Sequence, residues 1–248
     1  MLILAPGSVP ALRRWFIPER PGPLLFEHVA RTGYGRCRVD RWPDPQVVSA
    51  ELPGNYALRG DPAQLSARDL ARIAGFVEAP ADWLPTLRRS DPATGVWPRV
   101  IAALPAGATV PPPRADVRLL TPAHARALAG LSRESAWIHE TWGGPGGLLA
   151  AEVAQGVVLD GVVAALAVPF FVGAEHEDIG VVTEPAYRRR GLSTACAAAL
   201  VADIRARGRT PTWTTSPDNN GSLGVAARLG FEHVRDDVLY AVRTRIPG

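Results

Sequence analysis

The sequence predicts an α+β protein, in which a mixed sheet flanked by helices forms the C-terminal half and a smaller α/β unit precedes it. From residue 116 onward, strand-like apolar runs and helix-like runs follow each other in the order β-α-β-β-β-α-β-α-β. Residues 104–116 contain four prolines and no periodic apolar pattern, which is typical of a stiff linker. We therefore expect two units, residues 1–113 and 114–248, with residues 104–113 as the linker.

The composition indicates an ordinary globular protein. Of the 248 residues, 47% are hydrophobic and 21% are charged, which is enough apolar material for a core. The net charge is only +3 and the arginines are scattered, so nucleic acid is not an expected partner. Cys37 and Cys196 lie outside any metal-binding spacing, and Pro6 interrupts the apolar N-terminal run. We expect a cytoplasmic protein with no metal site and no membrane partner.

The first unit shows mixed strand and helix signals but no catalytic motif. Helical spacing predicts a helix over 66–77 with Ser66 as its N-cap, and a short helix over 83–89. The strands expected in this unit cover 35–42, 55–60 and 96–104. We interpret its polar side chains as structural, because those that could be grouped into a site are scattered: His28, Cys37 and Asp40.

The second unit has clearer boundaries. Thr121 and Pro122 provide an N-cap and a first-turn proline for a helix over 123–131. The Asp-Gly pair at 160–161 predicts a tight turn between two strands. The remaining expected elements are strands over 116–120, 156–161, 162–173, 177–183, 210–216 and 236–246, and helices over 187–208 and 222–230.

A run of positive charge marks the start of the helix expected over 187–208. Arg188, Arg189 and Arg190 directly precede Gly191, and a small-residue apolar run follows. The N-terminus of a helix already carries partial positive charge, so arginines there are unfavourable unless an anion lies among them. A glycine-bearing turn also leaves the first N–H groups of the helix unpaired, and such groups bind phosphate. We expect an anion site here, with a merely solvated basic turn as the alternative.

Two segments resemble the GNAT superfamily of acyl-CoA N-acyltransferases. VVTEPAYRRRGLST matches the family's Arg/Gln-x-x-Gly-x-Gly/Ala signature at Arg188, Gly191 and Ser193, where Ser193 replaces the usual glycine or alanine. SPDNNGSLGVAARLGF matches a second family pattern, and the matching residues are Asn219, Ser222, Gly230 and Phe231. The resemblance covers roughly residues 116–245. It leaves open whether the first unit is a degenerate copy of the same fold.

The resemblance implies acetyl-CoA as the cosubstrate. The coenzyme A pyrophosphate is expected at the turn formed by Arg188, Arg189, Arg190, Gly191, Leu192, Ser193 and Thr194, with Asn219 and Ser222 nearby. The backbone of Val181, Val182 and Thr183 is expected to pair with the pantetheine arm, because this strand is splayed from its neighbour in the family. A fully paired core strand is the alternative for these three residues.

The resemblance also suggests catalytic residues. Glu177 lies eleven residues before Arg188, where some family members keep a catalytic glutamate, so we predict it as the general base. Glu175, His176 and Asp178 are close alternatives. The family's usual tyrosine acid is replaced by Ala226. The leaving thiolate is therefore expected to be protonated by Ser222 or by water, or to leave without an acid.

An aromatic loop is the expected acceptor site. Trp137, His139, Glu140 and Trp142 combine tryptophan walls with a carboxylate, a combination that suits a cationic amine. We therefore expect an N-acetyltransferase that acts on a small-molecule amine by direct attack in a ternary complex, since no cysteine occupies a nucleophile position. The alternatives are a protein N-terminal or lysine acetyltransferase, and a non-catalytic acyl-CoA-binding sensor or interaction module.

Overall fold

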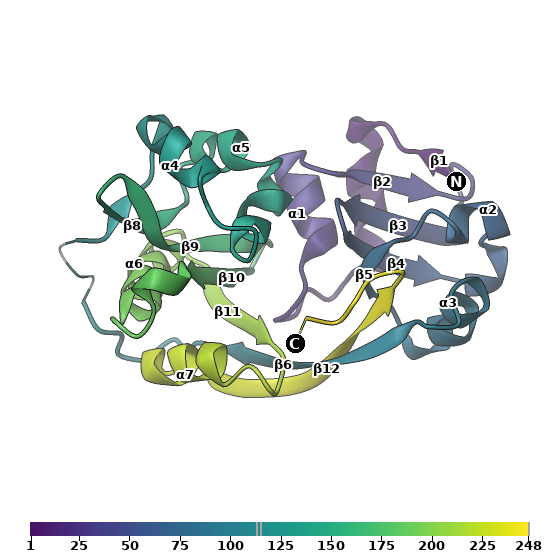
Figure 1. Cartoon of the computed structure of the whole chain (residues 1–248). Coiled ribbons are helices and arrows are strands. Elements are labelled where there is room, and N and C mark those ends of the chain that lie inside the picture. Colours follow the sequence, from purple (N-terminus) through teal and green to yellow (C-terminus); the bar gives the residue numbers. More distant parts are fainter. Residues whose placement is uncertain (113, 115, 248) are drawn as a thin grey trace.

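A single continuous sheet runs through the computed structural model, which describes residues 1–112, 114 and 116–247 (Figure 1). Within these residues, 12 strands are hydrogen-bonded in the order β1-β2-β3-β4-β5-β12-β6-β11-β10-β9-β8-β7. The α+β class and the helix-flanked mixed sheet expected from the sequence are therefore confirmed. The expected unit boundary at residue 113 lies outside the described residues.

The first half of the sheet is formed by the N-terminal strands. They are β1 (Leu2–Ile3), β2 (Arg36–Val39), β3 (Val47–Leu52), β4 (Asn55–Gly60), β5 (Gly75–Glu78) and β6 (Gly95–Ala103). The helices of this half are α1 (Leu25–Thr32), α2 (Ala67–Leu70) and α3 (Leu84–Ser90), with 3₁₀ helices η1 (Pro6–Trp15), η2 (Pro62–Gln64) and η3 (Ala81–Trp83).

The second half follows the order expected from the sequence, with one additional short helix before β8. Its strands are β7 (Arg118–Leu119), β8 (Gln155–Leu159), β9 (Val162–Val172), β10 (His176–Thr183), β11 (Thr210–Thr215) and β12 (Glu232–Val242). Its α-helices are α4 (Ala125–Ala129), α5 (Pro145–Ala150), α6 (Leu192–Ala206) and α7 (Asn220–Leu229). Its 3₁₀ helices are η4 (Pro122–His124), η5 (Ala136–Trp142) and η6 (Pro185–Tyr187).

The two halves repeat one strand pattern. In the first half β1 to β4 pair antiparallel and β4 pairs parallel with β5; in the second half β7 to β10 pair antiparallel and β10 pairs parallel with β11. The last strand of each half crosses over, because β6 pairs with β11 and β12 pairs with β5. A degenerate copy of the second half would show this repetition, and that origin for the first half stays a proposal.

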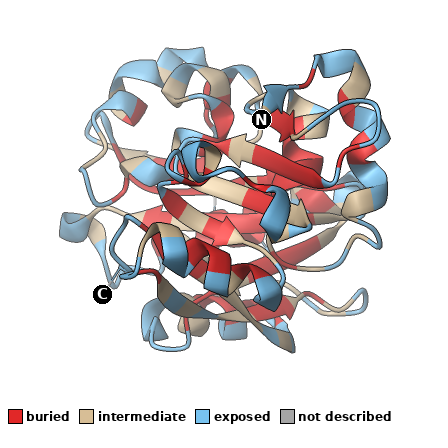
Figure 2. Ribbon diagram, turned by 90° about the vertical axis from the view of Figure 1, so that its right-hand side faces the viewer, coloured by how far each residue is buried: buried red, intermediate tan, exposed pale blue. Residues whose placement is uncertain are grey.

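The crossing strands join the halves through a long antiparallel ladder. β6 and β12 pair from Glu232↔Ala103 to Ala241↔Gly95, and both run along the lower side of the view in Figure 1. Each half packs helices on both faces of the sheet, and the strands between them are largely buried (Figure 2). In the second half α6 and α7 cover one face, and α4, α5 and η5 cover the other.

One expected element is wrong. The helix predicted over 66–77 ends after α2 at Leu70, and residues from Gly75 onward form β5. Ser66 caps the short helix as expected, since its hydroxyl accepts the Asp69 N–H at 3.1 Å. Gly75 has φ +146°, and a Cβ there would lie 2.2 Å from the Gly54 carbonyl oxygen. This close backbone approach starts the strand, and it overrides the helical spacing.

No helix in the described part of the chain has both the length and the apolar character needed to span a bilayer.

Candidate active site

The turn before α6 presents a row of unpaired backbone donors. The N–H groups from Arg189 through Thr194 have no hydrogen-bond partner among residues 1–112, 114 and 116–247. The backbone is left-handed at Arg189 (φ 62°) and at Gly191 (φ 74°), and this alternation turns successive N–H groups toward one side. Gly191 is the N-cap of α6 and supplies no side-chain cap. The turn is therefore a concavity of unpaired backbone amides at a helix N-terminus, the kind of feature that suits an anion.

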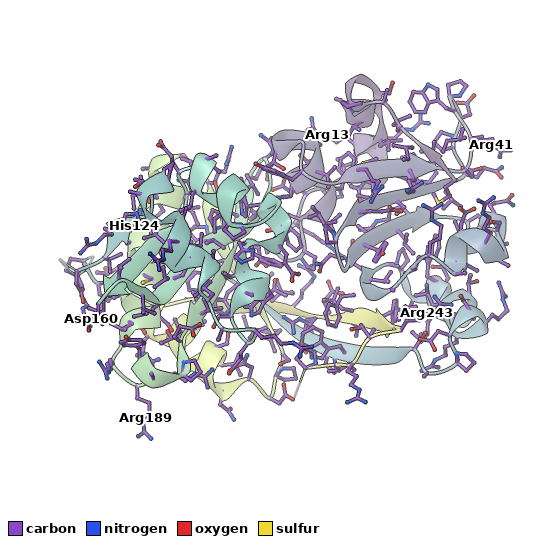
Figure 3. All side chains as sticks on the ribbon, turned by 45° about the horizontal axis from the view of Figure 1, so that its top comes forward. Arg13, Arg41, His124, Asp160, Arg189 and Arg243 are labelled. Atoms are coloured by element: carbon purple, nitrogen blue, oxygen red, sulfur yellow. The ribbon has the colours of Figure 1, made fainter. Side chains whose placement is uncertain are left out.

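The three arginines of the turn point in different directions. Arg188 forms an ion pair with Glu134 and donates from Nε to the Thr183 carbonyl at 3.4 Å. Arg190 lies over the Tyr187 ring, 5.3 Å from its centroid. The Arg189 side chain extends away from the ribbon into solvent (Figure 3). The unpaired donors of the turn are therefore its backbone amides rather than a cluster of the three guanidinium groups.

Strand β10 separates from β11 beside this turn. The two strands pair in parallel only from His176↔Thr210 to Asp178↔Thr212, although β10 continues to Thr183. The N–H of Glu184, just beyond the end of β10, donates to the Ala164 carbonyl of β9 at 3.0 Å. Hydrogen-bonding direction alternates along an antiparallel strand, so the backbone groups of Val181 and Thr183 face the opening and those of Val182 face β9. The splayed strand predicted for this segment is present.

The N-terminus of α7 flanks the same opening. The Asn219 side chain caps α7 by accepting the Ser222 N–H at 3.0 Å. The Ser222 hydroxyl accepts the Trp213 indole N–H at 2.9 Å, so its own proton remains available to a ligand. Arg228, in the last turn of α7, donates to the Thr194 hydroxyl in the first turn of α6 at 3.4 Å, so α7 packs beside the start of α6. Ligands of open α/β sheets bind at such carboxyl ends of parallel strands.

Comparison of the sequence with known proteins identifies the family of this chain. The GNAT acetyltransferase family model matches residues 150–240. A Streptomyces virginiae protein, described as an uncharacterized N-acetyltransferase in the mutA 5′ region, is 43% identical over 212 residues, which are 84% of this chain and 90% of the relative. The chain belongs to the GNAT family. It is therefore an acyl-CoA-dependent N-acyltransferase.

Two further comparisons agree with this assignment. A Bacillus subtilis protein, described as the uncharacterized N-acetyltransferase YdfB, is 31% identical over 70 residues, which are 28% of this chain and 27% of that protein. The crystal structure of a GCN5-related N-acetyltransferase-like protein from Streptococcus suis superposes with a TM-score of 0.72 at 19% identity, over 95% of this chain and 98% of that chain. At this identity, the second comparison shows that the fold of the whole chain is shared.

The predicted base of this GNAT protein lies in an ion-pair cluster. Glu177 is fully buried, and its carboxylate accepts from Arg207 at 3.0 and 2.7 Å and from Arg209 at 2.6 Å. Both arginines follow the C-terminal end of α6, and a helix of 15 residues is about 22 Å long. Glu177 therefore lies at the end of α6 opposite the amide turn, with both oxygens already occupied. These contacts contradict the prediction of Glu177 as the base and indicate a structural role.

Asp178 has the opposite environment. It is 4% exposed, lies at the last paired position before β10 and β11 separate, and faces away from α6. Its Oδ1 accepts hydroxyl bonds from Thr212 at 3.0 Å and Thr214 at 2.9 Å, whereas Oδ2 has no partner among the described residues. Burial raises the pKa of Asp178 to about 7, and the hydroxyl bonds and the charges of Arg99 and Arg235 oppose the rise. A carboxylate with a pKa near 7 can exchange a proton at neutral pH.

Arg99 was not singled out from the sequence, yet it borders this carboxylate. It lies on β6, with its guanidinium 4.0 Å from the centroid of the Trp97 ring and Nη2 donating to the Thr214 carbonyl at 3.2 Å. Burial lowers the pKa of Arg99 to about 10. Only the crossing of β6 beside β11 brings Arg99 to Asp178, so no local sequence signal could have found it.

The aromatic loop divides into site and core residues. Trp137 is 39% exposed, packs edge-on against Phe170, and covers Gly180 of β10, where an added Cβ would lie 3.5 Å from the indole. His139 has a buried Nδ1 without a partner in the described chain. Burial lowers the pKa of His139 and raises the pKa of the neighbouring Glu140. Trp137, His139 and Glu140 therefore remain candidates for the acceptor site.

Trp142 does not line that site. It is only 5% exposed, and its indole N–H donates to the Pro169 carbonyl at 2.8 Å. Its ring packs edge-on against His28 and Tyr34. The prediction of Trp142 as an acceptor contact is wrong, because the side chain fills the core between α1 and β9.

Proposed function

We propose that this GNAT protein transfers the acetyl group of acetyl-CoA to the amine of a small molecule. The observation that carries the proposal is the row of unpaired amides from Arg189 to Thr194 beside the splayed edge of β10. When bound, acetyl-CoA supplies the acyl group as a thioester. The chain's own residues then bind the cosubstrate, orient the amine and move a proton.

The amide turn fits the pyrophosphate of coenzyme A. An added Cβ at Gly191 would meet no atom within 4 Å, so the space in front of the turn is open to a ligand. The amides would donate to phosphate oxygens, and Arg188 and Arg190 would add charge at the rim. The free backbone groups of Val181 and Thr183 would pair with the amide groups of the pantetheine arm. The Val181 N–H is then a donor for the thioester carbonyl oxygen.

Asp178 replaces Glu177 as the proposed proton acceptor. An amine attacks an acyl group only in its neutral form, so a proton has to leave it at or before the attack. Asp178 Oδ2 is free to take this proton, and the Thr212 and Thr214 hydroxyls hold the carboxylate in place. Ser222 is the proposed donor to the leaving sulfur, because its hydroxyl already accepts from Trp213.

The cysteines favour direct attack over a covalent acyl-enzyme. Cys37 and Cys196 are both buried, and burial raises the pKa of each thiol to about 12. The thiolate is the nucleophilic form of cysteine, and these thiols stay protonated at neutral pH. A ternary complex of protein, acetyl-CoA and amine is therefore the proposed reacting state.

Trp137, His139 and Glu140 support a small amine as the acceptor. Trp137 lies over Gly180 of β10, and His139 and Glu140 follow it in η5, so the segment offers an aromatic surface and a carboxylate to a cationic ligand. The proposal is tested by measuring thiol release from acetyl-CoA with a panel of small amines, lysine peptides and peptides with free N-termini. Turnover with the small amines is expected.

Each other outcome of this experiment contradicts a defined part of the proposal. Turnover with peptides alone would indicate a protein acetyltransferase. Tight coenzyme A binding in calorimetry without turnover on any amine would indicate a sensor. Absence of coenzyme A binding by the folded chain would overturn the assignment of the amide turn.

A further inference from the structure

Arg99 is a half-buried cation without an ion-pair partner in the described part of the chain. Its hydrogen bond there is the one from Nη2 to the Thr214 carbonyl oxygen at 3.2 Å. Burial lowers the pKa of Arg99 to about 10, and the charges of Asp178 and Asp218 oppose this effect without forming an ion pair with it. Removing a guanidinium from water is unfavourable unless an anion pairs with it. The environment of Arg99 therefore suits a ligand that carries negative charge.

The Arg99 guanidinium is held in place with one nitrogen free. It lies 4.0 Å from the centroid of the Trp97 ring, and Nη2 is bound to Thr214. Nε has no partner either, but the protein encloses it, so a ligand cannot reach it. Nη1 has no partner in the described chain and is not enclosed. It can therefore donate to a bound molecule.

Arg99 and Asp178 flank the same residue. Strand β11 lies between β10 and β6, and its Thr214 hydroxyl donates to Asp178 Oδ1 at 2.9 Å, whereas the Thr214 carbonyl accepts from Arg99. Asp178 Oδ2 has no partner among the described residues and is not enclosed. A free carboxylate oxygen and a free guanidinium nitrogen thus lie on either side of Thr214, and they do not pair with each other.

The proposed acetyl transfer changes the charge balance between these two groups. The acceptor amine arrives protonated and gives its proton to Asp178, which is then neutral. Arg99 is left as a half-buried cation without the charge of Asp178 to oppose it, and Asp218 is exposed to solvent, which screens its charge. An acceptor with its own carboxylate supplies the missing negative charge at this point, and a simple amine does not.

We propose that the acceptor is an amino acid, whose amine lies at Asp178 Oδ2 and whose carboxylate accepts from Arg99 Nη1. This inference rests on the proposed acetyl transfer and names the class of its substrate; the carboxylate takes no part in the bonds that form and break. Because the two free atoms flank one residue, the amine and the carboxylate belong on the same or on adjacent carbon atoms. A singly charged carboxylate is also repelled less by Asp178 and Asp218 than a phosphate is. Trp137 covers β10 two residues further along, at Gly180, and offers an aromatic surface to the rest of the molecule.

The acceptors that test this proposal are the standard amino acids and β-alanine, each compared with its primary amide. The amide keeps the amine and the side chain but removes the negative charge. Thiol release from acetyl-CoA by the full-length chain gives kcat/KM for each acceptor. At least one amino acid should react with kcat/KM at least about tenfold above that of its amide, mainly through a lower KM, because a hydrogen bond between charged groups is lost in the amide.

Two contrary outcomes of this comparison have different meanings. Amides or simple amines that react as well as the amino acids, or better, would overturn this inference and leave the acetyl transfer standing. Absence of turnover with every acceptor, simple amines included, would contradict the proposed function and this inference with it.

A ratio measured within one variant assigns the preference to Arg99. Arg99→Met removes the guanidinium but keeps an unbranched side chain over Trp97, and it should lower the acid-to-amide ratio of kcat/KM at least about tenfold. Both acceptors meet the same variant, so a change in stability or in the pKa of Asp178 affects them alike and cancels in the ratio. For a variant without turnover, calorimetric titration of its coenzyme A complex with the same acid and amide gives the ratio from the Kd values. An unchanged ratio in folded Arg99→Met would refute the proposal.

Arg235→Met is the matched control. The charge of Arg235 also lowers the pKa of Asp178, but its nitrogens bind the Pro21 carbonyl and Asp237. This variant should therefore keep the acid-to-amide ratio of the wild type. An equal fall of the ratio in both variants would mean that the positive charge of the region, rather than a contact with Arg99, sets the preference.

Discussion

Glu177 and Asp178 are neighbours in β10, and their side chains enter opposite faces of the sheet with opposite chemistry. The Glu177 carboxylate forms ion pairs with Arg207 and Arg209, which follow the C-terminal end of α6. The Asp178 carboxylate is held by two threonine hydroxyls where β10 leaves β11, and burial raises its pKa to about 7. Successive side chains of a strand point to opposite faces of the sheet. Two adjacent acidic residues therefore have different roles here, one structural and one a candidate for catalysis.

Replacing Asp178 by asparagine should abolish most of the turnover while coenzyme A binding is retained. Asparagine keeps the size and an acceptor oxygen for Thr212 and Thr214 but cannot take a proton. Loss of a general base lowers the rate by about 10²- to 10⁴-fold. Wild-type kcat/KM should rise with pH as Asp178 is deprotonated around pH 7, and Asp178→Asn should lose this rise. Full activity of the folded variant at pH 7 would contradict the assignment.

Replacing Glu177 by glutamine should lower stability and leave the pH profile of turnover unchanged. The substitution leaves Arg207 and Arg209 without their carboxylate partner, with side chains 34% and 24% exposed. Breaking a fully buried pair costs about 3–5 kcal/mol, and solvent screening of these arginines reduces the expected loss to about 1–3 kcal/mol. Urea denaturation measures it, with Glu134→Gln as the control, because Glu134 is 61% exposed and its pair should contribute little. A stable Glu177→Gln variant without turnover would restore Glu177 as the base.

Gly191→Val should weaken coenzyme A binding at least tenfold. A Cβ at Gly191 meets no atom within 4 Å, so the substitution causes no clash within the protein. The cost comes from φ +74°, which a β-branched residue avoids, and from the valine filling the space in front of the amides. Gly208→Val is the matched control, since Gly208 has φ +73° and no neighbour within 4 Å at the other end of α6. Calorimetry should show weak binding only in Gly191→Val; equal loss in both variants would mean that strain alone explains it.

Each chain should bind one coenzyme A. In the first half, the segment between β4 and β5 corresponds to the amide turn, but side chains within the segment accept some of its backbone N–H groups. Asp61 accepts the Ala63 N–H at 2.9 Å, and Ser66 accepts the Asp69 N–H at the start of α2. The Asp69 carboxylate also binds the N-terminal ammonium group at 2.7 Å. A phosphate group is disfavoured beside these acids, so a stoichiometry of two in calorimetry would contradict this account.

The sequence located the local features of the site and missed those that depend on strand pairing. The row of unpaired amides lies within one short segment around Gly191, and the local sequence pattern pointed to that segment. Arg99 comes near enough to influence the charge of Asp178 because β6 crosses into the second half, and a strand exchange between halves leaves no local signal. Trp142 was misassigned for a similar reason, because α1 from the first half covers it.

Some element boundaries were also decided by contacts distant in sequence. Residues 66–77 have helical apolar spacing, yet Gly75 lies against Gly54, and the chain pairs with β4 and β12 from there on. β10 remains a strand although only His176 to Asp178 pair with β11, because β9 pairs with Glu177 to Thr183. Tertiary pairing overrides local propensity in the first case, whereas in the second it preserves a strand that the sequence also predicts.

His28 should make the protein less stable as the pH falls. It lies on α1, where Val172 N–H donates to Nδ1 at 3.2 Å and Nε2 lies 2.8 Å from the Thr141 carbonyl oxygen. These partners require a neutral ring with the proton on Nε2, since protonated Nδ1 would face another donor. Burial lowers the pKa of His28 to about 4. The unfolded chain binds a proton near pH 6.5 and the folded chain does not, so stability is full above pH 6.5 and declines toward pH 4.

Through His28, the free energy of unfolding should fall by about 3 kcal/mol in total. This is the free energy that corresponds to lowering its pKa from 6.5 to about 4. Asp178 acts in the opposite direction in the same range, because its raised pKa disfavours the folded state above pH 7 and this cost disappears on acidification. The quantity to measure is therefore the difference in unfolding free energy between His28→Gln and wild type at pH 7.5 and pH 4.5. The variant should be less stable at pH 7.5, and the difference should shrink at pH 4.5. His233→Gln is the control, since that side chain is 56% exposed, and its difference should not change with pH in this way. If the difference in unfolding free energy between His28→Gln and wild type were the same at both pH values, protonation of His28 would not account for the loss of stability at low pH.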